Sequence, residues 1–449
     1  MEFLDRAGRA GRAGRAGGAG GAGRAGRWAW VGAIALAASL SAASAPTELA
    51  VTGRSNATPS IASDGDVVAI AWGASTPAGA TDVYASVSRD GGRTFGPPVR
   101  VNDVDGDARL NGEQPPRVAV RGAGVTVVWT TKSANGTKLV TSRSADGGRT
   151  FARATLVPGG DAAGNRGWEN AAADRNGRVY AVWLDHRELA QQDGAVAASH
   201  HDHAGGAQPR ADGSQKPDGV AMAQRSKLYL ASLDGAVPPR ALTGGVCYCC
   251  KTALATAADG SIFAAWRHVY PGNIRDIAFT SSRDGGRTFA SPLRVSEDKW
   301  VLEGCPDDGP AMAVDAKGRV HIVWPTVITE KTEDGPTIAL FYAVSSDGKR
   351  FTPRQRIPTE GMPHHPQIAI GPDGSLTIAW DEGANGKRRA AIAHTSADAA
   401  AGSMVRTVIG DGAVYPVVAA TAGATVVAWT SGTSTASTIQ VRRVPLPGT

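Results

Sequence analysis

The feature that most constrains this 449-residue chain is a short apolar segment, closing on Trp, that occurs seven times. The copies are VVAIAW (67–72), VTVVWT (125–130), VYAVW (179–183), IFAAW (262–266), VHIVW (320–324), LTIAW (376–380) and TVVAW (425–429). Their Trp residues are 57, 54, 83, 58, 56 and 49 positions apart. Short β-branched segments of this kind are typical of buried strands. Because a period of this size built from strands indicates a ring of repeated sheets, we predict an all-β fold, a β-propeller.

The first 45 residues differ in composition from the rest. Six Arg alternate with Gly and Ala up to residue 27, an apolar run extends from Trp28 to Leu40, and Ala43-Ser44-Ala45 has a small-x-small cleavage pattern. This order predicts a signal peptide over residues 1–45 and a periplasmic or secreted mature chain. The apolar run is short for a membrane span, so we expect no stable span after cleavage; an uncleaved anchor is the alternative.

Most of the positive charge belongs to this leader. The formal net charge is +6, and removing residues 1–45 takes away six Arg and two acids, which leaves +2 on about 404 residues. A balance so close to neutral gives no reason to expect nucleic acid as a partner. The mature length suits one ring of repeated sheets over residues 46–449.

Each repeat contains segments for four strands. A segment often marked by Pro, such as PPRVAV (115–120) or HPQIAI (365–370), precedes a tight turn and the Trp strand, and two strands follow. The last repeat is one strand short, whereas ELAVTG (48–53) resembles a fourth strand without a repeat. We therefore expect this N-terminal strand to close the ring by pairing into the last blade. The result is seven four-stranded blades, with a six-blade ring as the alternative.

A second motif recurs between the third and fourth strands. SRDGGRTF (88–95), SADGGRTF (144–151) and SRDGGRTF (282–289) are nearly identical, and SSDGKRF (345–351) is a close variant. Ser and Asp side chains can bond the backbone of a turn, Gly supplies a positive φ, and Phe packs beneath the sheet. The motif resembles the Asp box of the sialidase-like, bacterial neuraminidase repeat family, and the resemblance covers residues 46–449. It implies a sialidase-like propeller whose Asp boxes lie on the face away from the ligand site.

The 83-residue interval contains an insertion of roughly 25 residues relative to the other intervals. It includes SHHDHAGGAQPRADGSQKPDG (199–219), whose composition cannot form a packed core. We expect a His-rich loop at about 190–220 that is an exposed polar segment or a weak, non-specific metal binder.

Strand order puts the loops that enter first strands and leave second strands on one rim of the ring. Closed β-structures usually bind ligands in such a mouth, so we expect a small ligand, a metal or a glycan there. The candidate ligand-binding residues are Glu113, Trp168, Asp185, Arg187, His268, Trp300, Asp308 and Glu382. For Trp168 and Trp300, covering a blade end is the alternative to stacking on a sugar.

All four cysteines fall in two of these rim loops. Counting back 16 residues from Trp266 and Trp380 reaches Cys250 and His364, so the two segments occupy comparable positions. One hypothesis is a copper or zinc site with the ligands Cys247, Cys249, Cys250, Cys305, His364 and His365. An even number of cysteines in an exported chain also fits disulfides, for example from the 247–250 loop to Cys305, or a redox-active or vicinal pair.

The resemblance to sialidases also implies an exo-glycosidase that holds a carboxylate with three Arg and uses a Tyr nucleophile activated by Glu. The catalytic candidates are Tyr415, Glu169 and Arg267. The early Arg-Ile-Pro motif is missing, because the one such sequence is at 356–358, late in the chain. The hypotheses are therefore, in order, an exported binding protein with a Cys/His rim site, a sialidase-type glycoside hydrolase, and a protein-interaction scaffold with structural disulfides.

Overall fold

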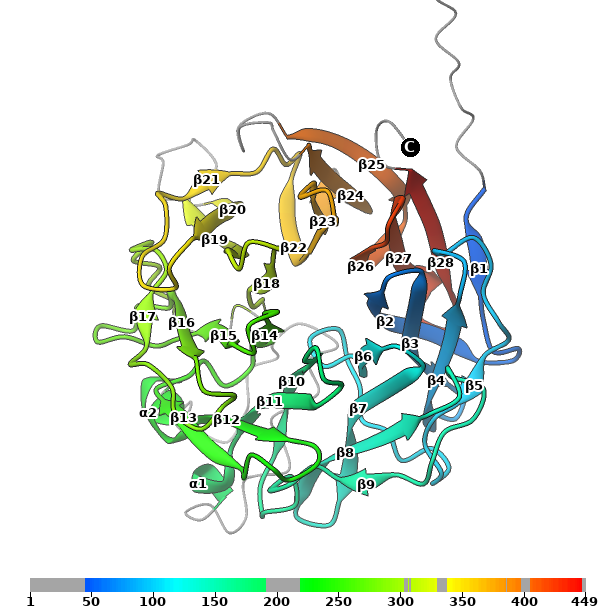
Figure 1. The fold of residues 1–449 in the computed structure, drawn as a ribbon, viewed down its shortest axis with the longest axis horizontal. Helices are drawn as coiled ribbons and strands as arrows, with labels where there is room; N and C mark the ends of the chain where they lie inside the picture. Colours follow the sequence, from blue (N-terminus) through cyan, green and yellow to red (C-terminus); the bar gives the residue numbers. More distant parts are fainter. Residues whose placement is uncertain are drawn as a thin grey trace, which may run out of the picture. The chain divides into compact units, whose positions relative to one another are not determined.

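The computed structural model describes residues 45–190, 219–302, 306, 308–328, 337–384, 386–396 and 404–445. Within these ranges, 28 strands form seven antiparallel sheets of four strands each. The sheets are blades arranged around a central axis (Figure 1), with the first strand of each blade innermost. The prediction of an all-β, seven-blade propeller is confirmed, and the six-blade alternative is wrong.

The blades follow one another along the chain. The first three comprise β2 (Ser55–Asp64), β3 (Val67–Ser75), β4 (Thr81–Ser88) and β5 (Val99–Arg100); β6 (Arg117–Arg121), β7 (Gly124–Ser133), β8 (Gly136–Ser144) and β9 (Thr155–Leu156); β10 (Arg166–Ala173), β11 (Val179–Asp185), β12 (Lys227–Ser232) and β13 (Arg240–Gly244). The next three comprise β14 (Ala253–Thr256), β15 (Ile262–Arg267), β16 (Ile277–Ser282) and β17 (Leu293–Arg294); β18 (Ala311–Val314), β19 (Val320–Ile328), β20 (Thr337–Ser345) and β21 (Gln355–Arg356); β22 (Met362–Ile370), β23 (Leu376–Ala384), β24 (Lys387–Thr395) and β25 (Val405–Asp411). The last comprises β26 (Ala413–Ala420), β27 (Ala424–Thr433), β28 (Ala436–Pro445) and β1 (Thr47–Leu49).

The N-terminal strand closes the ring, as its sequence predicts. β1 pairs antiparallel with β28, with Leu49 opposite Ile439, and so completes the last blade. Because β1 pairs with β28, the last blade has the same four strands as the others, and the first and last strands of the chain are joined in one sheet.

Two predicted segments fall largely outside the described residues. The predicted signal peptide is outside except for Ala45, and so is most of the His-rich loop, of which only the flanking helices α1 (Arg187–Ala190) and α2 (Gly219–Arg225) are described. Across the described ranges, no helix is both long enough and apolar enough to cross a membrane.

The seven repeated Trp side chains fill the spaces between blades. All are buried, with at most 3% of the side chain exposed. Trp129 packs in one cluster with Ala69 and Val83 of the preceding blade, and Trp72 packs with Val426 of the last blade. Since each indole bridges two blades, removing one would open a cavity that typically costs about 3–5 kcal/mol.

The four Ser-x-Asp turns have the expected hydrogen bonds. In the first, the Ser88 hydroxyl donates to Asp90 (2.7 Å), whose carboxylate accepts the backbone N–H groups of Arg93 and Thr94. Gly91 N–H donates to the carbonyl of Asp66 in the β2–β3 turn. The turns therefore lie on the face opposite to the points where the first strands begin.

The third blade contains a fifth such turn that the sequence analysis missed. The Ser232 hydroxyl donates to Asp234 (2.6 Å) and accepts from Val237 N–H (2.8 Å). Its sequence, Ser-Leu-Asp-Gly (232–235), keeps the Ser and Asp that form the hydrogen bonds of the turn, although the Phe is replaced. A search for Ser-x-Asp-Gly alone would therefore have identified it.

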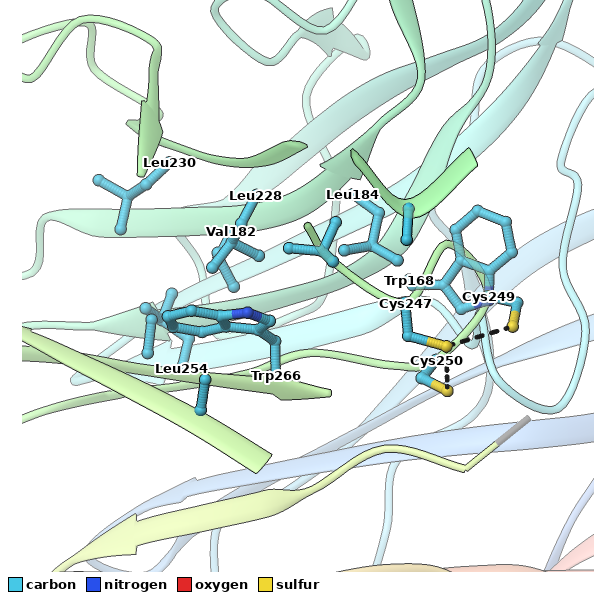
Figure 2. Close-up of a cluster of buried hydrophobic side chains, with 14 of the residues drawn as sticks. Trp168, Val182, Leu184, Leu228, Leu230, Cys247, Cys249, Cys250, Leu254 and Trp266 are labelled. Carbon is cyan, nitrogen blue, oxygen red and sulfur yellow. Dashed lines mark hydrogen bonds between the residues drawn. The ribbon is translucent and has the colours of Figure 1, made fainter. Parts of the chain in front are cut away.

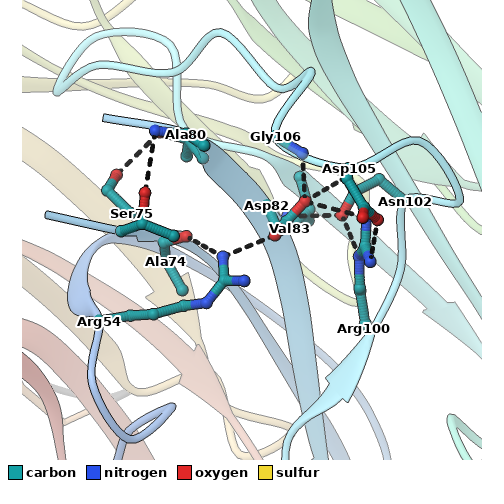
Figure 3. Close-up of polar contacts among 12 residues, drawn as sticks. Arg54, Ala74, Ser75, Ala80, Asp82, Val83, Arg100, Asn102, Asp105 and Gly106 are labelled. Carbon is teal, nitrogen blue, oxygen red and sulfur yellow. Dashed lines mark hydrogen bonds and ion pairs between the residues drawn. The ribbon is translucent and has the colours of Figure 1, made fainter. Parts of the chain in front are cut away.

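A buried carboxylate supports the outer edge of the first blade, where β5 has only two residues (Figure 3). Asp82 accepts hydrogen bonds from Arg54 (2.6 Å), Asn102 (2.8 Å) and Gly106 N–H (2.7 Å), and forms an ion pair with Arg100 (3.1 Å). Burial raises the pKa of Asp82, but these hydrogen bonds outweigh burial and hold the pKa below its ordinary value.

We predict that Gly92→Ala destabilises the ring more than Gly285→Ala does. Both glycines have positive φ (82° and 69°), so both variants carry the backbone strain of about 1–3 kcal/mol. Only at Gly92 would the new Cβ also lie 2.5 Å from Val426 Cγ2 of the last blade; at Gly285 nothing lies within 4 Å. Thermal unfolding of the two variants measures the difference. Equal losses of Tm would show that the contact between the first and last blades tolerates the extra methyl group.

Candidate functional site

The first strands of all seven blades surround a central cavity of about 290 Å³. Polar side chains gather at the end of this cavity where the first strands begin, and small apolar side chains line the rest. We call the polar end the mouth; its lining includes Arg117, Asn170, Lys251, Thr252 and Gln367.

In four blades the first strand contains a β-bulge near the mouth. At each bulge one non-glycine residue has a positive φ; these are Thr58 (56°), Trp168 (53°), His365 (52°) and Tyr415 (53°). Such conformations are costly for non-glycine residues and are often found at functional sites. Three of the four side chains are ones that the sequence analysis selected. The bulges also extend these first strands further towards the mouth than the sequence predicts, as in β22, which begins at Met362.

His365 lies at the centre of a polar cluster at the mouth. Its Nδ1 is 2.7 Å from Asp381 Oδ1, and its Nε2 is 3.8 Å from Glu113 Oε1. Burial lowers the pKa of His365, even though Asp308 and Glu113 oppose the shift. In the neutral imidazole, Nδ1–H donates to Asp381, which leaves the lone pair of Nε2 directed towards Glu113.

Asp308 and Tyr415 complete the surroundings of His365. Asp308 accepts from the backbone N–H of His365 (3.0 Å) and lies 2.9 Å from Nδ1 of His364. The Tyr415 ring is 4.5 Å from the His365 ring, centre to centre. A Cβ at Gly112 would lie 2.5 Å from the Tyr415 hydroxyl oxygen, so the absence of a side chain there lets Tyr415 approach the loop that carries Glu113.

Glu113 and Lys251 lie beside this cluster, and Lys251 also lines the cavity. The backbone N–H of Lys251 donates to Glu113 Oε2 (3.0 Å), and the Lys251 ammonium donates to the carbonyl of Pro366 (3.2 Å). Burial raises the pKa of Glu113 and lowers the pKa of Lys251, because both charged forms are desolvated.

Arg117, which lines the cavity, is hydrogen-bonded to Glu169. Arg117 Nε donates to the backbone carbonyl of Glu169 (2.8 Å), and Thr130 donates to Glu169 Oε2 (3.3 Å). Burial raises the pKa of Glu169 to about 7. Arg117 Nη2, Glu169 Oε1 and Glu113 Oε1 are buried with no hydrogen-bond partner among the described residues. Unpartnered buried polar atoms of this kind usually meet a water molecule or a ligand.

Three of the predicted rim residues instead accept a hydrogen bond from the indole N–H of the Trp two positions earlier. These pairs are Trp183 with Asp185 (3.0 Å), Trp266 with His268 (3.3 Å) and Trp380 with Glu382 (2.9 Å). Burial, with the nearby Arg294, lowers the pKa of His268 to about 4, which keeps it neutral and able to accept. These side chains accept the hydrogen bonds of buried indole N–H groups inside the blades, and they do not line the mouth.

Arg267 and Trp300 on the rim also make structural contacts. Arg267 is 1% exposed and donates to the carbonyls of Asp308 (3.0 Å), Arg275 (2.8 Å) and Pro325 (2.8 Å). Its guanidinium lies 4.8 Å from the centre of the Trp300 ring. With these contacts, Arg267 is not presented to the mouth.

Arg187 has a similar role in the third blade. Its guanidinium forms an ion pair with Asp185 (2.8 Å) and lies 4.3 Å from the centre of the Tyr229 ring. The structure therefore brings together Glu113, Asp308, His364, His365 and Tyr415. Arg187 is held away from them by Asp185, and Arg267 contacts this group only through the backbone carbonyl of Asp308.

The cysteine loop packs beside Trp168 in a buried apolar cluster (Figure 2). Cys247 Sγ is 3.4 Å from Cys250 Sγ and 3.8 Å from Cys249 Sγ, and Arg275 Nη1 lies 3.2 Å from Cys247 Sγ. The hydrogen bond from Cys250 lowers the pKa of Cys247 to about 7, with help from Arg275 and Arg267 against burial. Burial and the same hydrogen bond raise the pKa of the Cys250 thiol.

The three sulfurs lie within 4.8 Å of one another, although they differ in redox state. Cys247 and Cys250 are free thiols, whereas Cys249 is in a disulfide whose other sulfur lies outside the described residues. The vicinal Cys249–Cys250 bridge is therefore not formed. Cys305, the remaining predicted ligand, is outside the described residues, and the group of sulfurs includes neither His364 nor His365.

Sequence reasoning missed two charged residues of the mouth, Arg117 and Lys251. Arg117 directly follows Pro115-Pro116 at the start of its strand, and Lys251 directly follows Cys250. A charged residue at or just before the start of an innermost strand is the signal that could have found both, since Arg117 is the first residue of β6 and Lys251 lies two residues before β14.

Comparison with known proteins shows the fold and no family. The sequence matches no known family profile, and it matches no curated protein sequence. A structure of an ulvan lyase, a polysaccharide lyase, bound to a GlcA(1-4)Rha3S repeat superimposes with a TM-score of 0.53 at 9% identity, over 89% of this chain and 94% of that one. A protein of unknown function from Dyadobacter fermentans (TM-score 0.47, 12% identity, 90% and 98%) and a Hadza microbial sialidase (0.44, 14%, 81% and 73%) are more distant.

We predict that Glu169→Gln removes a pH dependence of stability. The pKa of Glu169 rises from 4.5 to about 7 on folding, so folding favours the protonated form. This contribution is complete below pH 4.5 and is lost as pH rises towards 7, by about 3 kcal/mol at roughly 1.4 kcal/mol per unit. Gln stays neutral, so the variant should match the wild type near pH 4.5 and exceed its Tm at pH 8.

Thermal unfolding between pH 4.5 and 8 tests this, with Glu297→Gln as the control because Glu297 is exposed. A difference between Glu169→Gln and wild type that stays constant over this range would contradict the raised pKa.

Proposed function

We propose that this chain is an exported, sialidase-like binding propeller whose mouth takes an anionic, sugar-like ligand. One observation carries the proposal: Arg117 keeps a buried guanidinium nitrogen without a hydrogen-bond partner among the described residues, at the mouth of the central cavity. A desolvated donor of this kind binds a carboxylate more strongly than a donor in water does.

The charge balance of the mouth supports an anion. Lys251 and Arg117 are two buried basic groups, and the burial that raises the pKa values of Glu113 and Glu169 also lowers those of Lys251 and Arg117. Asp308 is already bonded to His364 and to the backbone of His365. A carboxylate or sulfate beside Lys251 and Arg117 would favour their charged forms, because an opposite charge at short range offsets the cost of burying a cation.

The volume of the central cavity supports a single sugar residue, rather than an extended polymer, as the group bound within the ring. A volume of about 290 Å³ is just below the range of roughly 300–1,000 Å³ that is usual for ligand pockets. One glycan residue would occupy the cavity, with the remaining chain outside the mouth. The acidic glycan held by the ulvan lyase of similar fold is consistent with this class of ligand. The predicted signal peptide supports export to the periplasm or the cell exterior, where the chain would encounter glycans.

A second candidate function is acid–base chemistry on the same ligand, of the glycoside hydrolase type that the sequence analysis names as the alternative. The observation in its favour is the pair of His365 and Asp381, 2.7 Å apart, beside the Tyr415 ring. The orienting carboxylate leaves His365 Nε2 as a base, and the phenol of Tyr415 can act as acid or nucleophile. Glu382 is not part of this group, because Trp380 and Arg389 hold its carboxylate within the blade.

We predict that Arg117→Met weakens binding of a glucuronate oligosaccharide about 10–100-fold, the value of one charge-assisted hydrogen bond. Isothermal titration calorimetry compares this ligand with its carboxyl-reduced neutral analogue, which should bind weakly to both proteins. Arg187→Met is the matched control, since Arg187 is bonded to Asp185 away from the mouth. The proposal is wrong if the wild type binds both ligands equally, binds neither, or loses as much affinity through Arg187→Met.

For the second candidate, we predict that Tyr415→Phe and His365→Gln each lower the release of a fluorescent leaving group from a sialoside or glucuronide about 10²–10⁴-fold. Affinity for the uncleaved oligosaccharide should change much less, because neither variant removes Arg117 or Lys251. Absence of turnover by the wild type, with binding intact, would leave the chain a binding protein.

A further inference from the structure

The sulfurs of the cysteine loop are spaced like ligands around one metal ion. Cys247 Sγ lies 3.4 Å from Cys250 Sγ and 3.8 Å from Cys249 Sγ. At a metal–sulfur bond of about 2.3 Å, sulfurs in trigonal or tetrahedral coordination lie roughly 3.7–4.0 Å apart. The observed separations are close to these values, and all three sulfurs are within 4.8 Å of one another.

The same distances argue against an ion held by two sulfurs alone. A linear two-coordinate ion with bonds of about 2.3 Å would place its sulfurs roughly 4.6 Å apart. The free thiols Cys247 and Cys250 are more than an ångström closer than that. Cys249 is therefore needed as the third ligand.

The surroundings favour a soft monovalent ion. Cys247, Cys249 and Cys250 are at most 3% exposed and belong to the same buried apolar cluster as Trp168. Arg275 lies 3.2 Å from Cys247 Sγ and is itself fully buried. Three thiolates with one Cu(I) carry a net charge of −2, which a buried arginine at this distance helps to offset. Thiolate ligands also select Cu(I) over harder ions, and zinc usually requires a fourth ligand.

The Cys249 disulfide decides whether the third ligand is present. We propose that Cys247, Cys249 and Cys250 form a three-thiolate Cu(I) site that is completed when the Cys249 disulfide is reduced. A dithiol reductant supplies two electrons and two protons, is itself oxidised to a disulfide, and converts the bridge into two thiols. Binding of Cu(I) then displaces the protons of the three cysteine thiols into solution. In the oxidised chain the site lacks one ligand and does not retain the ion.

The test is a Cu(I) titration of the mature chain under anaerobic conditions, with and without prior reduction, against a chromophoric Cu(I) chelator. The reduced wild type should bind one Cu(I) per chain, and the oxidised wild type should not compete with the chelator. Cys247→Ser and Cys250→Ser should each lose stoichiometric binding after reduction. Cys305→Ser, which alters no proposed ligand, is the matched control and should bind like the reduced wild type.

X-ray absorption of the loaded wild type provides a measurement that does not depend on the folding of variants. Three sulfur neighbours at about 2.3 Å are expected. Two sulfurs, nitrogen or oxygen neighbours in the first coordination sphere, equal binding with and without reduction, or no binding by the reduced wild type would each overturn the proposal.

Arg275 is a positioning residue in this proposal. Arg275→Met should weaken Cu(I) binding about 10–100-fold, as is typical for groups that support a ligand from outside the coordination sphere, without changing the number of sulfurs seen by X-ray absorption. An unchanged affinity would show that the guanidinium does not stabilise the thiolates.

Discussion

The ring depends on burying one indole in each blade against the blade before it. Six of the seven repeated Trp side chains are 0–1% exposed, so the blade interfaces are closely packed around them. A buried indole N–H usually needs an acceptor within the protein, although that of Trp129 has none among the described residues. Trp72 uses Asn56, whereas Trp183, Trp266 and Trp380 use the residue two positions further along the strand.

This requirement explains why much of the charge near the rim is structural. The strand that contains each Trp ends at the rim shortly after it. A side chain that accepts from the indole N–H at this end therefore resembles a ligand-binding residue when only the sequence is read. Asp185 then needs cations of its own, which Arg166 and Arg187 supply. This role is not confined to the end of the Trp strand, because the Trp324 indole donates to Asp298 (2.7 Å), which lies in the loop before the innermost strand β18.

Much of the fold could be predicted from local patterns. The Trp period defined the blades, and the unpaired strand at 48–53 indicated how the ring closes, with β1 against β28. The bulges at His365 and Tyr415 could not be predicted, since a positive φ at a large side chain is imposed by the packing of neighbouring blades. Of the residues that lie together at the mouth, the sequence analysis had selected Glu113 and Asp308 as ligand-binding, Tyr415 as catalytic, and His364 and His365 as metal ligands. Arg117 and Lys251 were missed, because their importance comes from burial, which periodicity does not report.

The sequence by itself favoured seven blades over six and indicated the strand that closes the ring and the rim on which a ligand is expected. These follow from period, length and turn chemistry, all of which act over short stretches of chain. Only the tertiary structure decided which rim residues face a common space. Glu113, Lys251, Asp308 and His365 belong to four different blades, and their proximity arises where the first strands converge on the axis. The tertiary structure likewise separated the three sulfurs from His364 and His365, because side chains at equivalent points of neighbouring blades can point into different spaces.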